Sequence, residues 1–441
     1  MSQDLPPQAA RRKTEVLKVA DSDFGKFKDD AGLERIGGWE VSQLPSAQVL
    51  QEAAKYLKTK DIPVAFPTET VYGLGADATR AAAVKGIYSA KGRPSDNPLI
   101  IHVADLDMLR SVLQTESETN AATNGSHDRI PEIYKPLIER FWPGPLTILM
   151  PNPAPSKLAP QVTAGLKTFG VRMPASPLAR SLIKLVGAPL AAPSANASTK
   201  PSPTTAAHVL EDLDGRIELI LDGGPCLVGV ESTVVDGLCD PPVVLRPGGV
   251  SIDELRRCPG WEQVEKAYKD HSEAGKAAPR APGMKYKHYS PKARVVLYEA
   301  TCPGLHRGID HQGLGLNENN NNVVGVIRTR YWQPGGGLPC GNFKEQKELA
   351  APAGPDNQVS VELEVREANL YKPSDDAPIG KLLDISIGKD SRSIAQGLFS
   401  ALRELDRRGA DVIFVEGTLD DEDIGAAIMN RLRKAASQIK S

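Results

Sequence analysis

The chain has 441 residues, of which 53 are Lys or Arg and 55 are Asp or Glu, so its formal net charge is −2. This length is sufficient for two or three domains. The near-neutral charge excludes a general electrostatic attraction to nucleic acid or membranes, so any anion site has to be local. No apolar run reaches the roughly 20 residues that a membrane-spanning helix needs, and we expect no membrane contact.

Residues 1–44 are predicted to form a flexible N-terminal extension. Arg11, Arg12 and Lys13 resemble the charge of a mitochondrial presequence, but acids such as Asp4 and Glu15 lie among them, and presequences avoid acids. We therefore expect a cytoplasmic protein, with a mitochondrial fraction left open. The five cysteines are widely spaced and form no CxxC pair, which predicts neither a zinc site nor a disulfide framework.

Helical and strand patterns alternate between residues 45 and 265. The predicted elements, in chain order, are a helix over 46–58, a strand over 62–66, a helix over 81–90, strands over 99–103, 146–150 and 169–172, a helix over 177–186, a strand over 190–192, a helix over 204–210, and strands over 217–221 and 233–236. This order predicts an α/β fold built on a twisted sheet. The polar segment 114–129, with His127 in it, is predicted to be an inert surface insertion.

A linker over 266–293, rich in Lys, Ala, Pro and Gly, separates this first domain from a smaller one over 294–441. The second domain has predicted strands over 294–298, 323–327, 382–386 and 412–415 and helices over 391–408 and 423–436, with a low-complexity loop over 317–322. The pattern indicates a Rossmann-like α/β unit. No GxGxxG follows a strand, so we expect no dinucleotide there.

Two short motifs suggest a phosphate site. Lys91-Gly92-Arg93-Pro94 supplies two cations, and Ser194-Ala195-Asn196 supplies a hydroxyl and an amide. Locally, the Lys-Gly pair fits a plain helix stop equally well. Arg172, at the end of an apolar strand, and Arg246, which precedes Pro247-Gly248-Gly249, add two further candidate cations. The chain lacks GxxxxGK[ST], GxSxG and HExxH motifs, which argues against a P-loop NTPase, a serine hydrolase and a zinc protease.

These motifs stand in one order with several others. The others are Pro67-Thr68-Glu69-Thr70-Val71-Tyr72-Gly73, Asn97-Pro98-Leu99, Phe141-Trp142-Pro143-Gly144-Pro145, Gly170-Val171-Arg172-Met173-Pro174, Glu231-Ser232-Thr233 and Leu245-Arg246-Pro247-Gly248. Together they resemble the YrdC-like catalytic domain of threonylcarbamoyl-adenylate synthases, densely from about residue 44 to residue 251. The segment Pro282–Pro291 resembles the linker of the long form of that family. The resemblance implies a YrdC-like twisted-sheet domain with a concave cavity, followed by the Rossmann-like accessory domain.

The resemblance also implies a nucleotidyltransferase reaction. In the family, L-threonine, bicarbonate and ATP give threonylcarbamoyl-AMP and pyrophosphate. The product serves the N6-threonylcarbamoyladenosine modification at position 37 of tRNA and passes to a downstream threonylcarbamoyl transferase complex. Mg²⁺ is expected to accompany ATP, held mostly by phosphates and water. A weak contact with tRNA is a further expectation.

Carried over residue by residue, the resemblance assigns three groups of residues. Thr70, His102, Arg172, Ala192 and Ser232 are expected near L-threonine, with Ala192 contributing its backbone and Arg172 pairing with the carboxylate. Lys91, Arg93, Asn97, Thr168, Ser194, Asn196, Ser202 and Arg246 are expected near ATP. Lys285, Tyr286, His288 and Tyr289 are expected to form a lid over the site. His102 has a core histidine as its alternative, because it lies in an apolar strand.

Two other classes of protein compete with this interpretation. A concave basic cavity is also compatible with an RNA-binding module, but the chain has no basic stripe interleaved with aromatic residues. YrdC-like domains also occur in carbamoyl-transfer maturation enzymes. Those enzymes carry zinc-finger cysteines and an acylphosphatase-like domain, neither of which is evident in this sequence.

Overall fold

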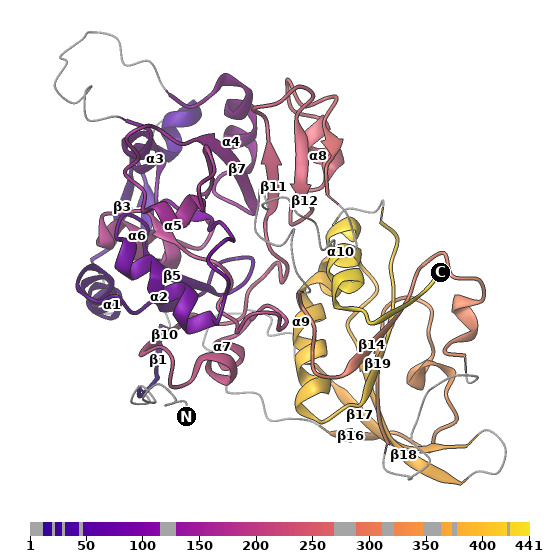
Figure 1. The fold of residues 1–441 in the computed structure, drawn as a ribbon. Helices are drawn as coiled ribbons and strands as arrows, with labels where there is room; N and C mark the ends of the chain where they lie inside the picture. Colours follow the sequence, from indigo (N-terminus) through magenta and orange to yellow (C-terminus); the bar gives the residue numbers. More distant parts are fainter. Residues whose placement is uncertain are drawn as a thin grey trace, which may run out of the picture.

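The computed structural model describes residues 12–19, 23–28, 31–43, 47–114, 129–268, 288–310, 322–346, 363–372, 377–420 and 424–441. The described residues form two lobes (Figure 1). The first is built on an eleven-stranded sheet and the second on a seven-stranded sheet. Among the described residues, no helix combines the length and apolar character needed to cross a membrane.

The first domain contains a mixed sheet with the strand order β1-β10-β4-β5-β9-β6-β8-β7-β11-β12-β13. Its elements are β1 (Glu15–Lys18), β2 (Gly25–Phe27), β3 (Trp39–Val41), α1 (Ala47–Thr59), β4 (Val64–Phe66), β5 (Gly73–Asp77), α2 (Ala81–Lys91), β6 (Ile101–His102), α3 (Leu106–Leu113), α4 (Lys135–Phe141), β7 (Leu146–Pro151), α5 (Pro160–Thr163), β8 (Thr168–Arg172), α6 (Pro177–Val186), β9 (Leu190–Ala191), α7 (Ala206–Leu213), β10 (Leu219–Asp222), β11 (Thr233–Asp236), β12 (Val243–Arg246), α8 (Ile252–Arg256) and β13 (Glu265–Lys266). Strands β2 and β3 pair separately.

Both faces of this sheet are covered. Val64 and Phe66 of β4 pack in a core with α1 and α6, whereas Ala65 belongs to the opposite core, which contains α2 and α7. Since side chains alternate along a strand, a strand buried on both faces has to be apolar throughout. This explains why the predicted strands of the domain are apolar runs instead of alternating patterns.

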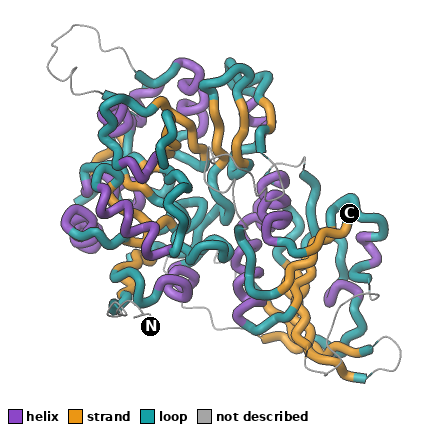
Figure 2. The backbone as a smooth tube through the Cα atoms, in the orientation of Figure 1, coloured by secondary structure: helices purple, strands orange, loops and turns teal. Residues whose placement is uncertain are grey.

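The second domain has the sheet order β16-β17-β18-β15-β19-β14-β20. Its elements are β14 (Arg294–Tyr298), β15 (Asn322–Arg328), β16 (Lys344–Gln346), β17 (Val365–Tyr371), β18 (Pro378–Ser386), α9 (Ser391–Arg407), β19 (Val412–Glu416), α10 (Gly425–Ala435) and β20 (Gln438–Lys440). Strands β18, β15, β19, β14 and β20 run parallel, which agrees with the expected Rossmann-like alternation. Helices α9 and α10 lie on the side of the sheet that faces the first domain (Figure 2).

The expected flexible extension is wrong for the part of residues 1–44 that the structure describes. Strand β1 adds to the edge of the first sheet, with Glu15 opposite Leu219 on β10. Trp39 of β3 is buried, and its indole donates a 2.9 Å hydrogen bond to Ser181. Apolar residues scattered among charged ones supply these contacts. The charged composition of the segment therefore did not indicate that it packs against the first sheet.

The predicted domain boundaries differ from the structure at one further place. Strand β13 pairs with β12 through Lys266, so the first sheet extends past residue 265. Asn322, expected in a low-complexity loop, is buried and begins β15. Residues 115–128 of the expected surface insertion, with His127, lie outside the described residues.

Candidate active site

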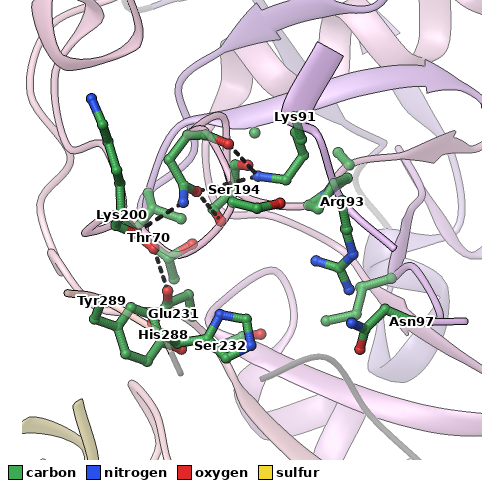
Figure 3. A pocket seen from close by; sticks show the side chains of 18 of the residues that line it. Thr70, Lys91, Arg93, Asn97, Ser194, Lys200, Glu231, Ser232, His288 and Tyr289 are labelled. Carbon is green, nitrogen blue, oxygen red and sulfur yellow. Dashed lines mark hydrogen bonds between the residues drawn. The ribbon is translucent and has the colours of Figure 1, made fainter. Parts of the chain in front are cut away.

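A cavity of about 300 Å³ lies in the first domain, bounded by the linker residues His288 and Tyr289 (Figure 3). Its walls come from the ends of strands and from loops. His102 and Arg172 are paired in register at the ends of β6 and β8, so adjacent parallel strands deliver both side chains to the same place. The expected site residues that line the cavity are Thr70, Lys91, Arg93, Asn97, His102, Arg172, Ala192, Ser194, Asn196, Ser202, Ser232, Arg246, His288 and Tyr289.

Three expected site residues are not among those lining the cavity. Thr168 begins β8, opposite Pro151, and is four residues from Arg172 along the strand. At about 3.3 Å per residue, this spacing puts Thr168 roughly 13 Å from Arg172 along the strand. Lys285 and Tyr286 lie outside the described residues.

Lys91 ends α2, and Gly92 after it adopts a left-handed conformation with φ +61°. The helix-stop interpretation is therefore correct, and the same lysine also lines the cavity. Its ammonium donates to the Ser194 carbonyl, to the Asn196 carbonyl at 2.6 Å and to Asn196 Oδ1 at 3.3 Å. Burial, followed by the nearby charge of Arg93, lowers the pKa of Lys91 well below its usual range. Lys91 thus ties the two sequence motifs together.

Arg93 and Asn97 carry buried polar atoms with no hydrogen-bond partner in the structure. These atoms are Arg93 Nε and Asn97 Oδ1. Arg93 uses Nη2 to donate to the Pro98 carbonyl at 3.2 Å. Both side chains lie on the side of the cavity opposite Tyr289 (Figure 3). Because buried polar groups are nearly always paired, these two atoms are available to a polar ligand or to water.

Arg172 and His102 form a second polar group. Arg172 donates from Nη1 to Thr70 Oγ1 at 2.9 Å and from Nη2 to Glu69 Oε2 at 3.0 Å, while its Nε has no partner. His102 Nδ1 is likewise buried without a partner. Burial, followed by the charge of Arg172, lowers the pKa of His102 well below its usual value, so the ring is neutral. The group combines one cation with a neutral imidazole.

Ser232 and Arg246 form a third polar group in the lining of the cavity. Arg246 donates from Nε and Nη2 to the Ser232 carbonyl at 3.1 and 2.8 Å, and Ser232 Oγ lies 2.8 Å from Thr147 Oγ1. Burial lowers the pKa of Arg246 to about 10. Ser202 donates to Glu231 Oε1 at 2.5 Å.

Sequence reasoning missed several residues that line the cavity, including Thr68, Ser198, Thr199, Lys200 and Glu231. Glu231 stands directly before Ser232 in the motif Glu231-Ser232-Thr233, and this position was the available signal. Lys200 and Thr199 belong to a proline- and serine-rich segment that has no periodic pattern.

The cavity does not provide a protein cage for Mg²⁺. Glu231 is the single carboxylate among the lining residues that the structure describes, and its oxygens accept from Ser202 and Arg431. Within the described parts of the chain, no group of three or more His, Cys, Asp and Glu side chains is placed to hold a metal ion. Octahedral Mg²⁺ needs several oxygen ligands, so the lining residues do not fit a resident ion.

The fold and the cavity define an α/β protein with a concave, cation-lined site that suits an anionic ligand of small-molecule size. Comparison with known proteins agrees. Residues 57–248 match the family described as "Telomere recombination", and residues 250–437 match "Threonylcarbamoyl-AMP synthase, C-terminal domain".

Curated relatives cover nearly the whole chain. A protein of Schizosaccharomyces pombe named threonylcarbamoyl-AMP synthase is 45% identical over 405 residues, which cover 88% of each chain. One of the same name from Bacillus subtilis is 41% identical over 387 residues, covering 88% of this chain and 92% of the relative. The crystal structure of P. abyssi Sua5 complexed with L-threonine is 34% identical, has a TM-score of 0.69 and covers 97% of this chain and 99% of that one. The chain belongs to the threonylcarbamoyl-AMP synthase family, in its two-domain form.

Proposed function

We propose that the protein is an L-threonylcarbamoyladenylate synthase, a nucleotidyltransferase that makes threonylcarbamoyl-AMP and pyrophosphate from L-threonine, bicarbonate and ATP. One observation carries the proposal. One cavity is lined by the pair Lys91 and Arg93 and also by Arg172 beside neutral His102. The first set suits phosphates and the second suits an amino-acid carboxylate.

The proposed chemistry needs no covalent intermediate with the protein. The threonine amine attacks bicarbonate, water leaves, and a carbamate forms. A carbamate oxygen then attacks the α-phosphorus of ATP, the bond to the β-phosphate breaks, and pyrophosphate leaves. The protein contributes proximity and charge stabilisation through Lys91, Arg93 and Arg246, and it orients threonine through Arg172. His102 is too weak a base to be protonated, so it acts as a neutral hydrogen-bonding group.

The proposal includes the expected partners. Mg²⁺ would enter with ATP and supply charge neutralisation at the phosphates, held by phosphate oxygens and water, since the lining residues offer no cage. The product would pass to a threonylcarbamoyl transferase complex for modification of position 37 of tRNA, with weak direct contact between this protein and tRNA. A cytoplasmic location with a mitochondrial fraction is proposed on the sequence alone.

The first test is pyrophosphate release. We expect release from ATP to require both L-threonine and bicarbonate, because the carbamate is the nucleophile. The measurement is a coupled pyrophosphate assay with each substrate omitted in turn, and with L-threonine replaced by L-alanine. Release that ignores threonine and bicarbonate, or no release together with salt-sensitive tRNA binding, would overturn the proposal and favour the RNA-binding alternative.

We further propose that residues 288–290 act as part of a lid. The Tyr289 ring stacks on Phe399 of α9 with centroids 5.3 Å apart. Burial, followed by the charge of Glu231, raises the pKa of Tyr289 to about 12. The Ser290 amide donates to the Thr199 carbonyl at 2.9 Å. The lid is therefore anchored to both domains at the edge of the cavity.

Removal of the Tyr289 side chain should expose the labile adenylate to water. We expect Tyr289→Ala to lower the ratio of threonylcarbamoyl-AMP to AMP by about tenfold, because water exclusion is lost. The ratio is measured by chromatography of quenched reactions. Tyr289→Phe is the matched control, since it keeps the ring on Phe399 and should retain most of the ratio. An unchanged ratio in Tyr289→Ala would contradict the lid.

A further inference from the structure

Two arginines of the second domain reach the first domain and are buried there. Arg403 on α9 and Arg431 on α10 have side chains that are 4% and 0% exposed. Arg431 donates from Nε to Glu231 Oε2 at 3.0 Å and from Nη1 to the Pro247 carbonyl. Arg403 pairs with Asp212 of α7, whose side chain is fully buried. Neither pair lies at an exposed rim, where salt bridges contribute little.

Arg403 forms a bidentate ion pair with Asp212 through both terminal nitrogens of its guanidinium. Nη1 lies 3.2 Å from Oδ1 and Nη2 lies 2.7 Å from Oδ2, and Nη2 also donates to the Pro201 carbonyl at 2.5 Å. A fork of this kind fixes the orientation of the carboxylate as well as its distance. Burial alone would raise the pKa of Asp212, but the hydrogen bonds and charge of Arg403, joined by Lys200, lower it.

Asp212 in turn holds the segment that lines the phosphate side of the cavity. Its Oδ2 accepts from the Ala197 amide at 3.2 Å, and its Oδ1 accepts from Lys200 Nζ at 2.8 Å. Asn196 Nδ2 donates to the Lys200 carbonyl at 3.0 Å, and the Ser198 amide donates to the Lys91 carbonyl at 2.9 Å. Arg403 thus contacts Pro201 directly and holds Ala197 and Lys200 through Asp212. These residues belong to the segment 197–201, which follows the Ser194-Ala195-Asn196 motif that Lys91 binds.

We propose that Arg403 is a positioning residue for the nucleotide half of the cavity, acting through Asp212 and Pro201, and that this is one role of the second domain. The proposal rests on the proposed function in that ATP is taken as the ligand of this half. A buried ion pair is a costly way to attach two domains, since apolar side chains of similar volume stabilise an interface at least as well. A bidentate ion pair, however, fixes orientation as well as distance, and this property suits an ion pair that holds the loop at residues 197–201.

The interface offers a way to disturb this contact alone. Arg431 on Glu231 and the 2.9 Å contact between Thr204 Oγ1 and Ser400 Oγ would still seat the second domain when Arg403 is changed. Arg328 supplies a matched control, because it pairs with fully buried Asp384 at 2.7 Å entirely inside the second domain. Loss of either arginine removes a buried ion pair, but only Arg403 reaches the cavity loop.

The experiment compares Arg403→Ala, Arg403→Lys and Arg328→Ala in the full chain. We expect Arg403→Ala to raise the KM for ATP by at least about tenfold, since small misplacements of a binding loop can cost up to about a hundredfold. The KM for L-threonine should stay within about twofold. Arg403→Lys keeps the charge but loses the fork, so it should be intermediate. Hydrogen exchange, measured without substrates, should be faster at the amides of residues 197–200 in Arg403→Ala only.

Each outcome is decisive. Unchanged KM values and unchanged exchange in a folded Arg403→Ala protein would overturn the inference, as would an equal rise in the KM for ATP in Arg328→Ala. If Arg403→Ala does not fold, Arg403→Lys and Asp212→Asn carry the same comparison. If the unmodified protein releases no pyrophosphate, the proposed function fails, whereas the exchange at the amides of residues 197–200 still tests the positioning contact.

Discussion

Lys91→Ala should reduce pyrophosphate formation by about 10²–10³-fold, the loss typical of removing one preorganised stabilising group. Two effects combine in this variant. The cavity loses a buried cation, and the Ser194 and Asn196 carbonyls lose the donor that holds them together. Because burial lowers the pKa of Lys91, bound phosphate should favour the protonated form and raise that pKa again.

Two further variants separate the loss of charge from the loss of structure. Lys91→Met keeps most of the volume but none of the charge, so activity should remain as low as in Lys91→Ala. Lys85→Ala, at an exposed position on the same helix, should leave the rate within about twofold. The measurement is single-turnover pyrophosphate release at saturating substrates. Near-normal release by Lys91→Met would contradict a role for the charge and leave only a packing role.

The sequence was sufficient to predict about half of the described elements of the first domain, mainly strands that are buried on both faces and helices that have one apolar face. Helix α6 has the predicted limits, and α2 differs by one residue. Strand β5 was missed because its sequence, Gly73–Asp77, is too small and glycine-rich to resemble a strand. The structure explains one of its glycines, since a Cβ at Gly75 would lie 2.5 Å from the Phe66 ring.

Contacts between the domains could not be predicted from the sequence. Asp212 and Arg403 each lie on an amphipathic helix and would ordinarily be solvated charges. Their contact joins residues 191 positions apart, and nothing in either helix pattern indicates it. The cavity residues, in contrast, could be predicted where family motifs name them, as for Lys91 and Asn196. Thr168 was assigned by the same resemblance and does not line the cavity.

The polar groups of the cavity fall into two sets: those with hydrogen-bond partners inside the protein, and those with a buried atom that has none. Lys91 and Arg246 are satisfied by backbone carbonyls of the loops they hold. Arg93 Nε, Arg172 Nε and His102 Nδ1 are buried without partners. We infer that Lys91 and Arg246 shape the site while contributing positive charge, and that the second set has atoms free to contact the ligands directly.

Arg172→Ala should raise the KM for L-threonine by about a hundredfold, with the KM for ATP changed by less than about threefold. Removal of one member of a buried charge pair costs about 2–5 kcal/mol, and about 1.4 kcal/mol is a factor of ten. The Arg172 fork already contacts Thr70 and Glu69, so the threonine carboxylate would join an oriented cation. The measurement is initial rates with each substrate varied in turn.

Arg172→Ala also leaves the Glu69 carboxylate buried without its ion pair, and Glu69 has a side chain only 8% exposed. That loss should lower the free energy of unfolding by about 3–5 kcal/mol. The double variant Arg172→Met with Glu69→Gln removes both charges and should recover much of this stability while the KM for L-threonine stays high. Glu69→Gln alone frees Arg172 from a competing anion, so its KM for L-threonine should be equal to or below normal. Equal rises in both KM values for Arg172→Ala, or recovery of the KM for L-threonine in the double variant, would show that Arg172 stabilises the fold and does not bind the carboxylate.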